Sequence, residues 1–270
     1  MFPRPAGIRT EQCDNIIGVD EVGMGAVLGP LVVAAVVITP GKVAGVRDSK
    51  MVSNENTRFA LAEDIKRCAS AWKIAQVSND YIDQHGLDAA WDKAVVAVIE
   101  AIRKEADLSA VVDGGKLPST VGRVFALPKA DRLIYQVSAA SLVAKAHRDA
   151  IVIAAAQRYP QYGLEENKGY PTKKHLDALR RFGPTPLHRK SFRATTDPEG
   201  SMRREELKFD KSSADKMIGD LSGLQSNPLA SDWEKQYVSD MVYRLKNNLE
   251  LSPRQMFFLQ AVHGRRRKRS

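Results

Sequence analysis

Four acidic residues have the chemical type and the setting that metal-dependent chemistry requires. Asp20 and Glu21 interrupt an apolar run, Asp113 lies between two valines and two glycines, and Asp131 follows a short Pro-Lys-Ala segment. Each has an ordinary structural explanation: a buried salt bridge or strand edge for the first pair, a turn residue for Asp113 and a helix N-cap for Asp131. Taken together, they favour a functional site, because clustered acids repel one another unless a cation neutralises them.

The chemistry that such a cluster could perform is phosphodiester hydrolysis. Oxygen ligands without cysteine favour Mg²⁺ or Mn²⁺, and two such ions about 4 Å apart can activate a water and stabilise a leaving oxygen. Neighbouring residues on a regular strand point to opposite faces, so Asp20 and Glu21 reach one site only if the strand ends, bulges or bends there. Gly23 and Gly25 would permit a bend.

The elements that must position these acids alternate between strands and helices over the first two hundred residues. Apolar β-branched runs predict strands at 16–22, 31–38, 72–77, 110–112 and 123–127. Helical spacing and capping residues predict helices at 54–70, 78–86, 87–106, 131–159 and 172–182. The longest, 131–159, is rich in alanine and contains neither Gly nor Pro. This order indicates an α/β fold in which helices cover a sheet.

Composition excludes several classes of protein. The longest apolar stretch, 26–38, is shorter than the roughly 20 residues of a membrane span, and residues 1–10 lack the apolar region of a secretory signal. The two cysteines, Cys13 and Cys68, are too few for a disulfide framework or a zinc site. We therefore expect a cytoplasmic protein that binds no membrane.

The charge of the chain favours a polyanionic partner, because its formal net charge is +9. Past Arg193 the composition changes: residues 194–230 are polar with Asp-Pro, Ser-Gly and Asn-Pro breaks, and helices are predicted at 232–247 and 253–262. Five basic residues at 265–269 are typical of a solvated tail. We predict a catalytic domain at 1–195 and, at 196–270, a linker followed by a helical, basic extension.

The chain resembles the type 2 ribonucleases H over about residues 14–195, through eight motifs in the same order. These are 18–25 with Gly29-Pro30 and 32–37, 48–50 (Asp-Ser-Lys), 112–114 (Val-Asp-Gly), 129–131 (Lys-Ala-Asp), 138–141 (Ser-Ala-Ala-Ser) with 144–145 (Ala-Lys), 159–163 (Tyr-Pro-Gln-Tyr-Gly), 168–170 (Lys-Gly-Tyr) and 188–192 (His-Arg-Lys-Ser-Phe). Because no TATA-box-binding-like module precedes the first motif, the chain is more similar to ribonuclease HII than to ribonuclease HIII.

This resemblance implies a fold and an activity. The expected fold is an RNase H-like mixed sheet flanked by helices, with a small helical C-terminal extension. The implied activity is endonucleolytic hydrolysis of the RNA strand of RNA–DNA hybrids, a step of DNA replication and repair, by two metal ions that leave 5′-phosphate and 3′-OH ends. Duplexes with embedded ribonucleotides are a further candidate substrate. The implied metal ligands and catalytic residues are Asp20, Glu21, Asp113 and Asp131. We expect no organic cofactor and a monomer.

The same resemblance implies substrate-binding residues. The family's Gly-Arg-Gly loop, which contacts the ribose 2′-OH at an RNA–DNA junction, corresponds to Gly23, Met24 and Gly25. Tyr170 corresponds to a tyrosine that packs on the sugar of the following deoxynucleotide, although its pattern alone favours a core residue. Lys50, in the Asp-Ser-Lys motif, is a further substrate-binding candidate.

Two departures from the family pattern bear on this expectation. Met24 replaces the loop arginine, which removes a cation that could meet a phosphate, but the flanking glycines leave backbone contact with the 2′-OH open. Ala130 replaces the glycine of a Lys-Gly-Asp motif, a milder change that need not disturb Asp131.

Other interpretations of these residues are weaker. Gly23, Gly25 and Gly29 follow a strand as in dinucleotide-binding folds, but Pro30 and the β-branched run after it predict a second strand where that fingerprint requires a helix. A non-catalytic nucleic-acid-binding protein would gain nothing from four clustered acids, and divalent-metal binding would distinguish it. Neither His147 nor His188 lies in a recognisable catalytic triad.

Overall fold

The computed structural model describes residues 15–46, 54–119 and 122–201, together with 235, 237, 239–241 and 243. The chain forms two compact units, Met1–Pro198 and Glu199–Ser270. In the second unit, residues 199–201 are helical, and so are the six described residues within the helix predicted at 232–247. The linker predicted at 194–230 is wrong at its start, because residues 194–196 and 198–201 are helical. The rest of it, from 202 to 230, and the helix predicted at 253–262 lie outside the described residues. Among the helices described, none is long and apolar enough to cross a membrane.

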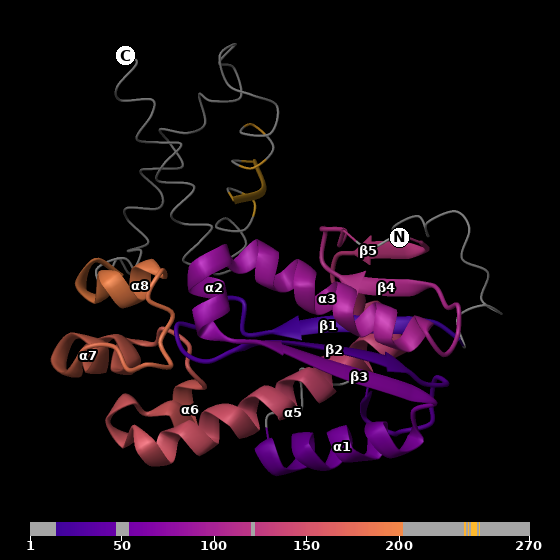
Figure 1. The fold of residues 1–270 in the computed structure, drawn as a ribbon, viewed down its shortest axis with the longest axis horizontal. Coiled ribbons are helices and arrows are strands. Elements are labelled where there is room, and N and C mark those ends of the chain that lie inside the picture. The colour runs from indigo at the N-terminus through magenta and orange to yellow at the C-terminus, as the bar shows by residue number, and fades with distance from the viewer. Residues whose placement is uncertain are drawn as a thin grey trace. The chain divides into compact units, whose positions relative to one another are not determined.

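A five-stranded mixed sheet in the order β3-β2-β1-β4-β5 forms the centre of the first unit (Figure 1). The antiparallel part consists of β1 (Ile17–Val22), β2 (Leu31–Val37) and β3 (Ala71–Val77). The parallel part joins β1 to β4 (Ala110–Asp113) and β4 to β5 (Val124–Leu127). Every residue of β2 is buried, as its continuous apolar run predicts for a strand covered on both faces.

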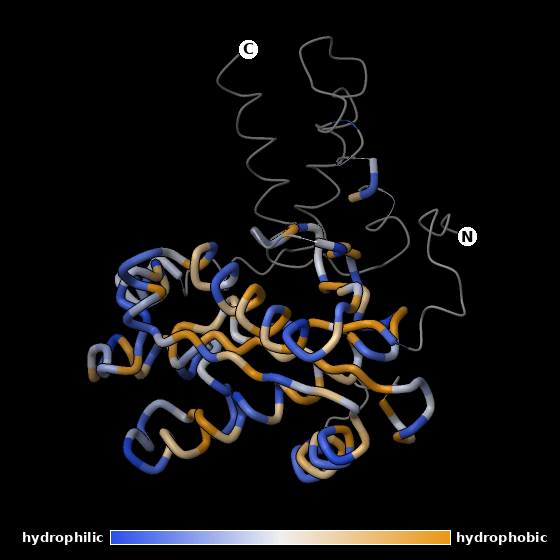
Figure 2. Tube along the Cα trace, turned by 45° about the vertical axis from the view of Figure 1, so that its right-hand side comes forward, coloured by the Kyte–Doolittle hydropathy of each residue, from blue (hydrophilic) through white to orange (hydrophobic). Residues whose placement is uncertain are grey.

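Helices cover both faces of this sheet (Figure 1). Helix α3 (Leu87–Arg103) packs on one face against Ile17 and Val19, and helices α1 (Glu55–Cys68) and α5 (Tyr135–Arg158) pack on the other against alternate residues of β2. The central strands are mostly apolar and the hydrophilic residues lie on the outer faces of the helices (Figure 2). The α/β class and the mixed sheet flanked by helices are therefore confirmed.

Shorter elements complete the first unit at one end of the sheet. They are α2 (Asn79–His85), a 3₁₀ turn η3 (Pro160–Tyr162), α6 (Leu164–Asn167), α7 (Lys173–Phe182) and α8 (Arg193–Thr196). Ser78 and Thr172 cap α2 and α7 as predicted, each accepting a hydrogen bond from a backbone N–H three residues later.

The single helix predicted at 131–159 is wrong, because the chain is broken at Ile134. A four-residue helix α4 (Ala130–Leu133) precedes α5, and Ile134 between them has an extended backbone with φ −119° and ψ 120°. Tertiary contacts hold the break from both sides: the Asp113 carboxylate accepts the Ala130 N–H, and the Tyr135 hydroxyl bonds to the backbone of Val43. Lys129, and not Asp131, is the N-cap of α4. The other predicted elements start and end within about three residues of the observed positions.

Candidate active site

Three of the four acids come from the region where the parallel pairing of β1 with β4 ends. The pairing of β1 with β4 runs to Val19 opposite Val112, so Asp20 and Asp113 are the next residues on neighbouring strands. An Asp113 oxygen accepts the N–H of Ala130 at 2.7 Å, which ties α4, and with it the buried Asp131, to the end of β4. Strand order therefore brings together acids that are about ninety residues apart in the sequence.

Glu21 approaches the same region from the other face of the sheet. Strand β1 stays regular past the acids, with Asp20 opposite Ala34 and Glu21 opposite Val33, so no bulge turns the two side chains to one side. Ala34 belongs to the core cluster under α5, and Val33 belongs to the cluster under α3. The two acids accordingly meet different helices.

Each of these two acids has a partner on the helix that it faces. On the α5 side, Ser141 hydrogen-bonds to the Asp20 carboxylate, and Lys145 donates to the Ser141 hydroxyl at 2.6 Å. On the α3 side, the Trp91 indole N–H donates to Glu21 at 3.2 Å. Together the two helices fix the orientation of both acids.

The electrostatics of the cluster disfavour its charged form. Burial, and after it the neighbouring Asp113, raises the pKa of Asp20 to about 6, although Ser141 and Lys145 oppose the shift. Burial and the adjacent Asp20 likewise raise the pKa of Glu21 to about 7. Neighbouring acids that resist losing their protons have the character of a cation site, because a bound cation would favour the ionised form.

The donor set fits a hard divalent cation, but its members are not gathered around one point. All four candidate ligands are carboxylates, which Mg²⁺ and Mn²⁺ prefer. Within the described ranges, no three His, Cys, Asp or Glu side chains are grouped so as to hold a metal ion. Asp20 and Glu21 extend from opposite faces of β1, so their carboxylates would have to turn toward the strand edge to share an ion.

The loop after β1 is shaped by glycine. Gly23 has φ +94°, and a Cβ there would lie 2.5 Å from the Arg148 Nε atom and 2.9 Å from the Pro30 oxygen. Gly25 is exposed, with open space where a Cβ would be. Met24 lies between them, half-buried, and its side chain packs against the core cluster under α3. The loop thus exposes the backbone of Gly25, and the apolar side chain of Met24 takes the place that corresponds to the family's loop arginine.

Two fully buried arginines bind the backbone of this loop through hydrogen bonds. Arg148 of α5 donates to the carbonyls of Leu28, Pro30 and Lys168, and Arg189 donates to those of Gly29 and Met24. Buried guanidinium groups are costly unless their donors are satisfied, and in this pair the Arg189 Nη2 group has no hydrogen-bond partner among the described residues. Their bonds to backbone carbonyls therefore fasten the 23–30 segment to the 168–170 turn.

Tyr170 lies on that turn, next to the loop. Its neighbour Gly169 accepts hydrogen bonds from the N–H groups of Val27 and Leu28. Tyr170 is 37% exposed, and the Arg148 guanidinium lies 5.3 Å from the centroid of its ring. The alternative that Tyr170 is a core residue is therefore wrong. Lys50 lies outside the described residues.

Comparison with known proteins decides the family. Residues 17–195 match the family model described as Ribonuclease HII. Ribonuclease HII of Sphingopyxis alaskensis is 44% identical over 177 residues, 66% of this chain and 88% of that protein. Ribonuclease HII of Francisella philomiragia is 40% identical over 179 residues, 66% of this chain and 96% of that protein. The chain belongs to the ribonuclease HII family.

A solved structure agrees with this assignment. The crystal structure of ribonuclease H2 from Pyrococcus horikoshii superposes with a TM-score of 0.58 at 26% identity, covering 70% of this chain and 99% of that one. The RNase H-like fold is therefore confirmed, and the protein is a ribonuclease H, a hydrolase. The ribonuclease HII match contains the four acids, the glycine loop and Tyr170, and it ends at Thr195.

The sequence does not reveal the roles of several residues of this ribonuclease HII site. Ser141 and Lys145 belong to recognised motifs, and their four-residue spacing places them on one face of a helix, but nothing points that face toward Asp20. Trp91 resembles any core aromatic of an amphipathic helix. Arg148 and Arg189 resemble surface charges, because their partners are backbone carbonyls that leave no trace in the sequence.

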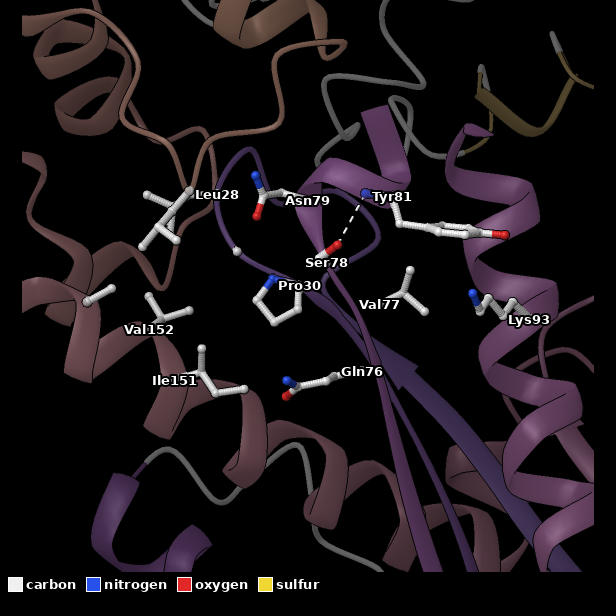
Figure 3. Close-up of a pocket in the computed structure, with 13 residues that line it drawn as sticks. Leu28, Pro30, Gln76, Val77, Ser78, Asn79, Tyr81, Lys93, Ile151 and Val152 are labelled. Carbon is white, nitrogen blue, oxygen red and sulfur yellow. Dashed lines mark hydrogen bonds between the residues drawn. The ribbon is translucent and has the colours of Figure 1, made fainter. Parts of the chain in front are cut away.

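A pocket of about 410 Å³ lies beside the same loop but does not contain the acids (Figure 3). Leu28 and Pro30 line it together with Gln76 of β3 and Val152 of α5. None of the four acids lines this pocket, so it is separate from the candidate active site of the ribonuclease HII unit.

Proposed function

We propose that this protein is an endoribonuclease that hydrolyses the RNA strand of RNA–DNA hybrids. Asp20, Glu21, Asp113 and Asp131 would be its catalytic residues and metal ligands. The observation that carries this proposal is a group of buried and half-buried, mutually repelling acids where the pairing of β1 with β4 ends, in a chain of the ribonuclease HII family.

The cofactor would be Mg²⁺ or Mn²⁺ in a two-metal site. When bound, such ions activate a water and stabilise the leaving oxygen, which yields 5′-phosphate and 3′-OH ends. The chain's own groups would prepare the ligands. Lys145 and Ser141 favour the ionised form of Asp20, Trp91 orients Glu21, and Asp113 holds α4, which carries Asp131.

The substrate would lie across the glycine loop and Tyr170. The exposed backbone at Gly25, next to the buried Gly23, is suited to contact a ribose 2′-OH, and Tyr170 is exposed enough for its ring to pack on a sugar. Met24 contributes no charge, and Lys50 is a further candidate contact. Hybrids are therefore the proposed main substrate, with embedded ribonucleotides as the second.

The cellular setting and the domain division are also proposals. The composition supports a cytoplasmic protein, and the resemblance to ribonuclease HII supports a monomer that acts in DNA replication and repair. A catalytic domain at 1–195 would be joined to an extension at 196–270 that adds sequence-independent affinity for nucleic acid, in keeping with the basic residues at 265–269.

Replacing single acids tests the proposed chemistry. Cleavage of a uniform RNA–DNA hybrid and of a duplex with one ribonucleotide is measured with Mg²⁺ or Mn²⁺ and with EDTA. We expect EDTA to abolish cleavage, and Asp20→Asn or Asp113→Asn to lower it about a hundredfold or more, since neither ligand can be spared. Melting temperatures should stay level or rise, because repulsion is relieved.

A matched control separates this effect from a general loss of charge. Asp64→Asn removes a half-exposed acid of α1 that pairs with its own helix neighbour Arg67, and should leave cleavage unchanged. Near wild-type cleavage by either active-site variant at saturating metal, or cleavage that survives EDTA, would refute the proposed function.

A further inference from the structure

Two histidines are buried beneath Tyr170. His175 of α7 and His188 are both fully buried, their Nε2 atoms lie 3.0 Å apart, and their ring centroids are 5.2 Å apart. The Tyr162 ring packs against both. Two nitrogens at this distance form a hydrogen bond only if one carries a proton and the other does not.

The surroundings of the pair determine which nitrogen carries the proton. The backbone N–H of Thr185 donates to His188 Nδ1 at 2.9 Å, so that nitrogen is an acceptor and the proton of neutral His188 is on Nε2. His188 therefore donates to His175 Nε2. His175 carries its own proton on Nδ1, which donates to the Tyr170 carbonyl at 2.9 Å. The result is a chain of hydrogen bonds from Thr185 through both rings to Tyr170.

This chain requires both rings to be neutral. Burial, followed by the proximity of His175, lowers the pKa of His188 to about 4, and burial lowers the pKa of His175. Near pH 7 both imidazoles are therefore uncharged, and each has one donor and one acceptor in use.

The turn that carries Tyr170 is one that needs support. Lys168 and Gly169 both have positive φ, 49° and 79°, and a lysine in this region is held only when its surroundings determine it. The Tyr170 N–H donates to the Asn167 oxygen and its carbonyl accepts from His175. The backbone of Tyr170 is thus fixed on one side by the turn itself and on the other by the histidine pair.

The histidine pair is also tied to the substrate loop. His188 forms an isolated antiparallel bridge with Leu28, and the next residue, Arg189, donates its N–H to the Val27 carbonyl. The same 188–189 segment therefore contacts the loop through its backbone, while the His188 side chain is linked to Tyr170 through His175. Any shift of His188 would change the spacing between loop and tyrosine.

We propose that His175 and His188 are positioning residues that set the Tyr170 ring for substrate binding. This inference rests on the proposed function, in which the ring packs on a substrate sugar. Neither histidine touches the substrate, since both are fully buried. Their effect is carried by the hydrogen bond to the Tyr170 carbonyl.

A double-mutant cycle tests this role. The dissociation constant for a duplex with an RNA–DNA junction is measured in EDTA, so that cleavage does not enter, for His175→Leu in the wild-type and Tyr170→Ala backgrounds. We expect about a tenfold weaker complex in the wild-type background, the scale of one aromatic contact. In the Tyr170→Ala background we expect no further loss, because the ring to be positioned is absent.

A conservative variant guards against simple misfolding. His175→Asn keeps an N–H donor near the position of Nδ1, so it should recover most of the affinity that His175→Leu loses, at a similar melting temperature. An equal loss of affinity from His175→Leu in both backgrounds, or a loss that follows the melting temperature across the variants, would overturn the inference.

The two sets of experiments distinguish a failure of this inference from a failure of the proposed function. Unchanged binding by Tyr170→Ala alone would refute the sugar contact, and with it the role of the histidines. The roles of the four acids are tested by cleavage and not by binding in EDTA, so their failure would not alter this result.

Discussion

Gly18→Ala should disrupt the site without touching any of its residues. Gly18 lies on β1 two residues before Asp20, on the same face, where the strand crosses the start of α5. A Cβ at this position would lie 2.2 Å from the carbonyl carbon of Gln136 and 2.4 Å from the nitrogen of Val137. Both are backbone atoms of α5, so no side-chain rotation can relieve the clash.

The size of the effect follows from that distance. Ordinary contact begins near 3.4 Å, so the strand and the helix must separate by about 1.2 Å. Overpacking costs about 1–3 kcal/mol, and a rigid backbone places this case at about 3 kcal/mol. For a unit of this size the melting temperature should fall by about 6–12 °C. Because α5 also carries Ser141 and Lys145, a shift of about 1 Å should slow cleavage about a hundredfold.

Thermal unfolding and single-turnover cleavage measure the two effects. Gly115→Ala is the matched control, since a Cβ added at Gly115 would meet no heavy atom within 4 Å and the φ of this residue is ordinary. The control should melt within about 2 °C of wild type. A Gly18→Ala protein that melts with the control and cleaves normally would show that β1 and α5 are not packed backbone to backbone, and would refute the reasoning.

Three further predictions concern charge, pH and the extension. Met24→Arg should make the log–log salt dependence of substrate binding more negative by about 0.9, and an unchanged slope would show that residue 24 does not face the substrate. Burial lowers the pKa of His188 to about 4, so the stability that neutral His188 contributes is present above about pH 6.5 and is lost as the pH falls toward 4. Denaturant titrations should show that the free energy of unfolding of the wild type falls by up to about 3 kcal/mol over that window, relative to that of His188→Gln. If the stability difference between wild type and His188→Gln does not change with pH, His188 is not held neutral. A chain ending at Thr195 should fold, bind metal and cleave at saturating substrate with a raised KM at physiological salt; aggregation or a large drop in melting temperature would indicate that the extension is part of the fold.

Periodicity predicts most of the elements but not the interruption that matters for the site. Strand β2 is predictable because seven consecutive apolar residues suit a strand buried on both faces. The break at Ile134 is not predictable, since the segment contains neither Gly nor Pro and its helix propensity is high. The bonds from Asp113 to Ala130 and from Tyr135 to Val43 override that propensity, and both are long-range.

The acids themselves could be identified from their setting, but their arrangement could not. Asp20 is conspicuous because it interrupts an apolar run, whereas its proximity to Asp113 depends on β1 and β4 being parallel neighbours. The sequence argument required the strand to end, bulge or bend for Asp20 and Glu21 to reach one site, and β1 remains regular through both residues. The buried arginines escape prediction because guanidinium groups are rarely this enclosed.

The division of Asp20 and Glu21 between the two faces of β1 has a consequence for assembly. Asp20 is oriented by α5 and Glu21 by α3, so each layer of helices supplies the orientation of one acid. If both are metal ligands as proposed, a partly folded chain with only one layer docked would hold an incomplete ligand set and bind metal weakly. Metal affinity would then show whether both helix layers have docked on the sheet. Saturating metal would stabilise only the chain in which both layers are docked.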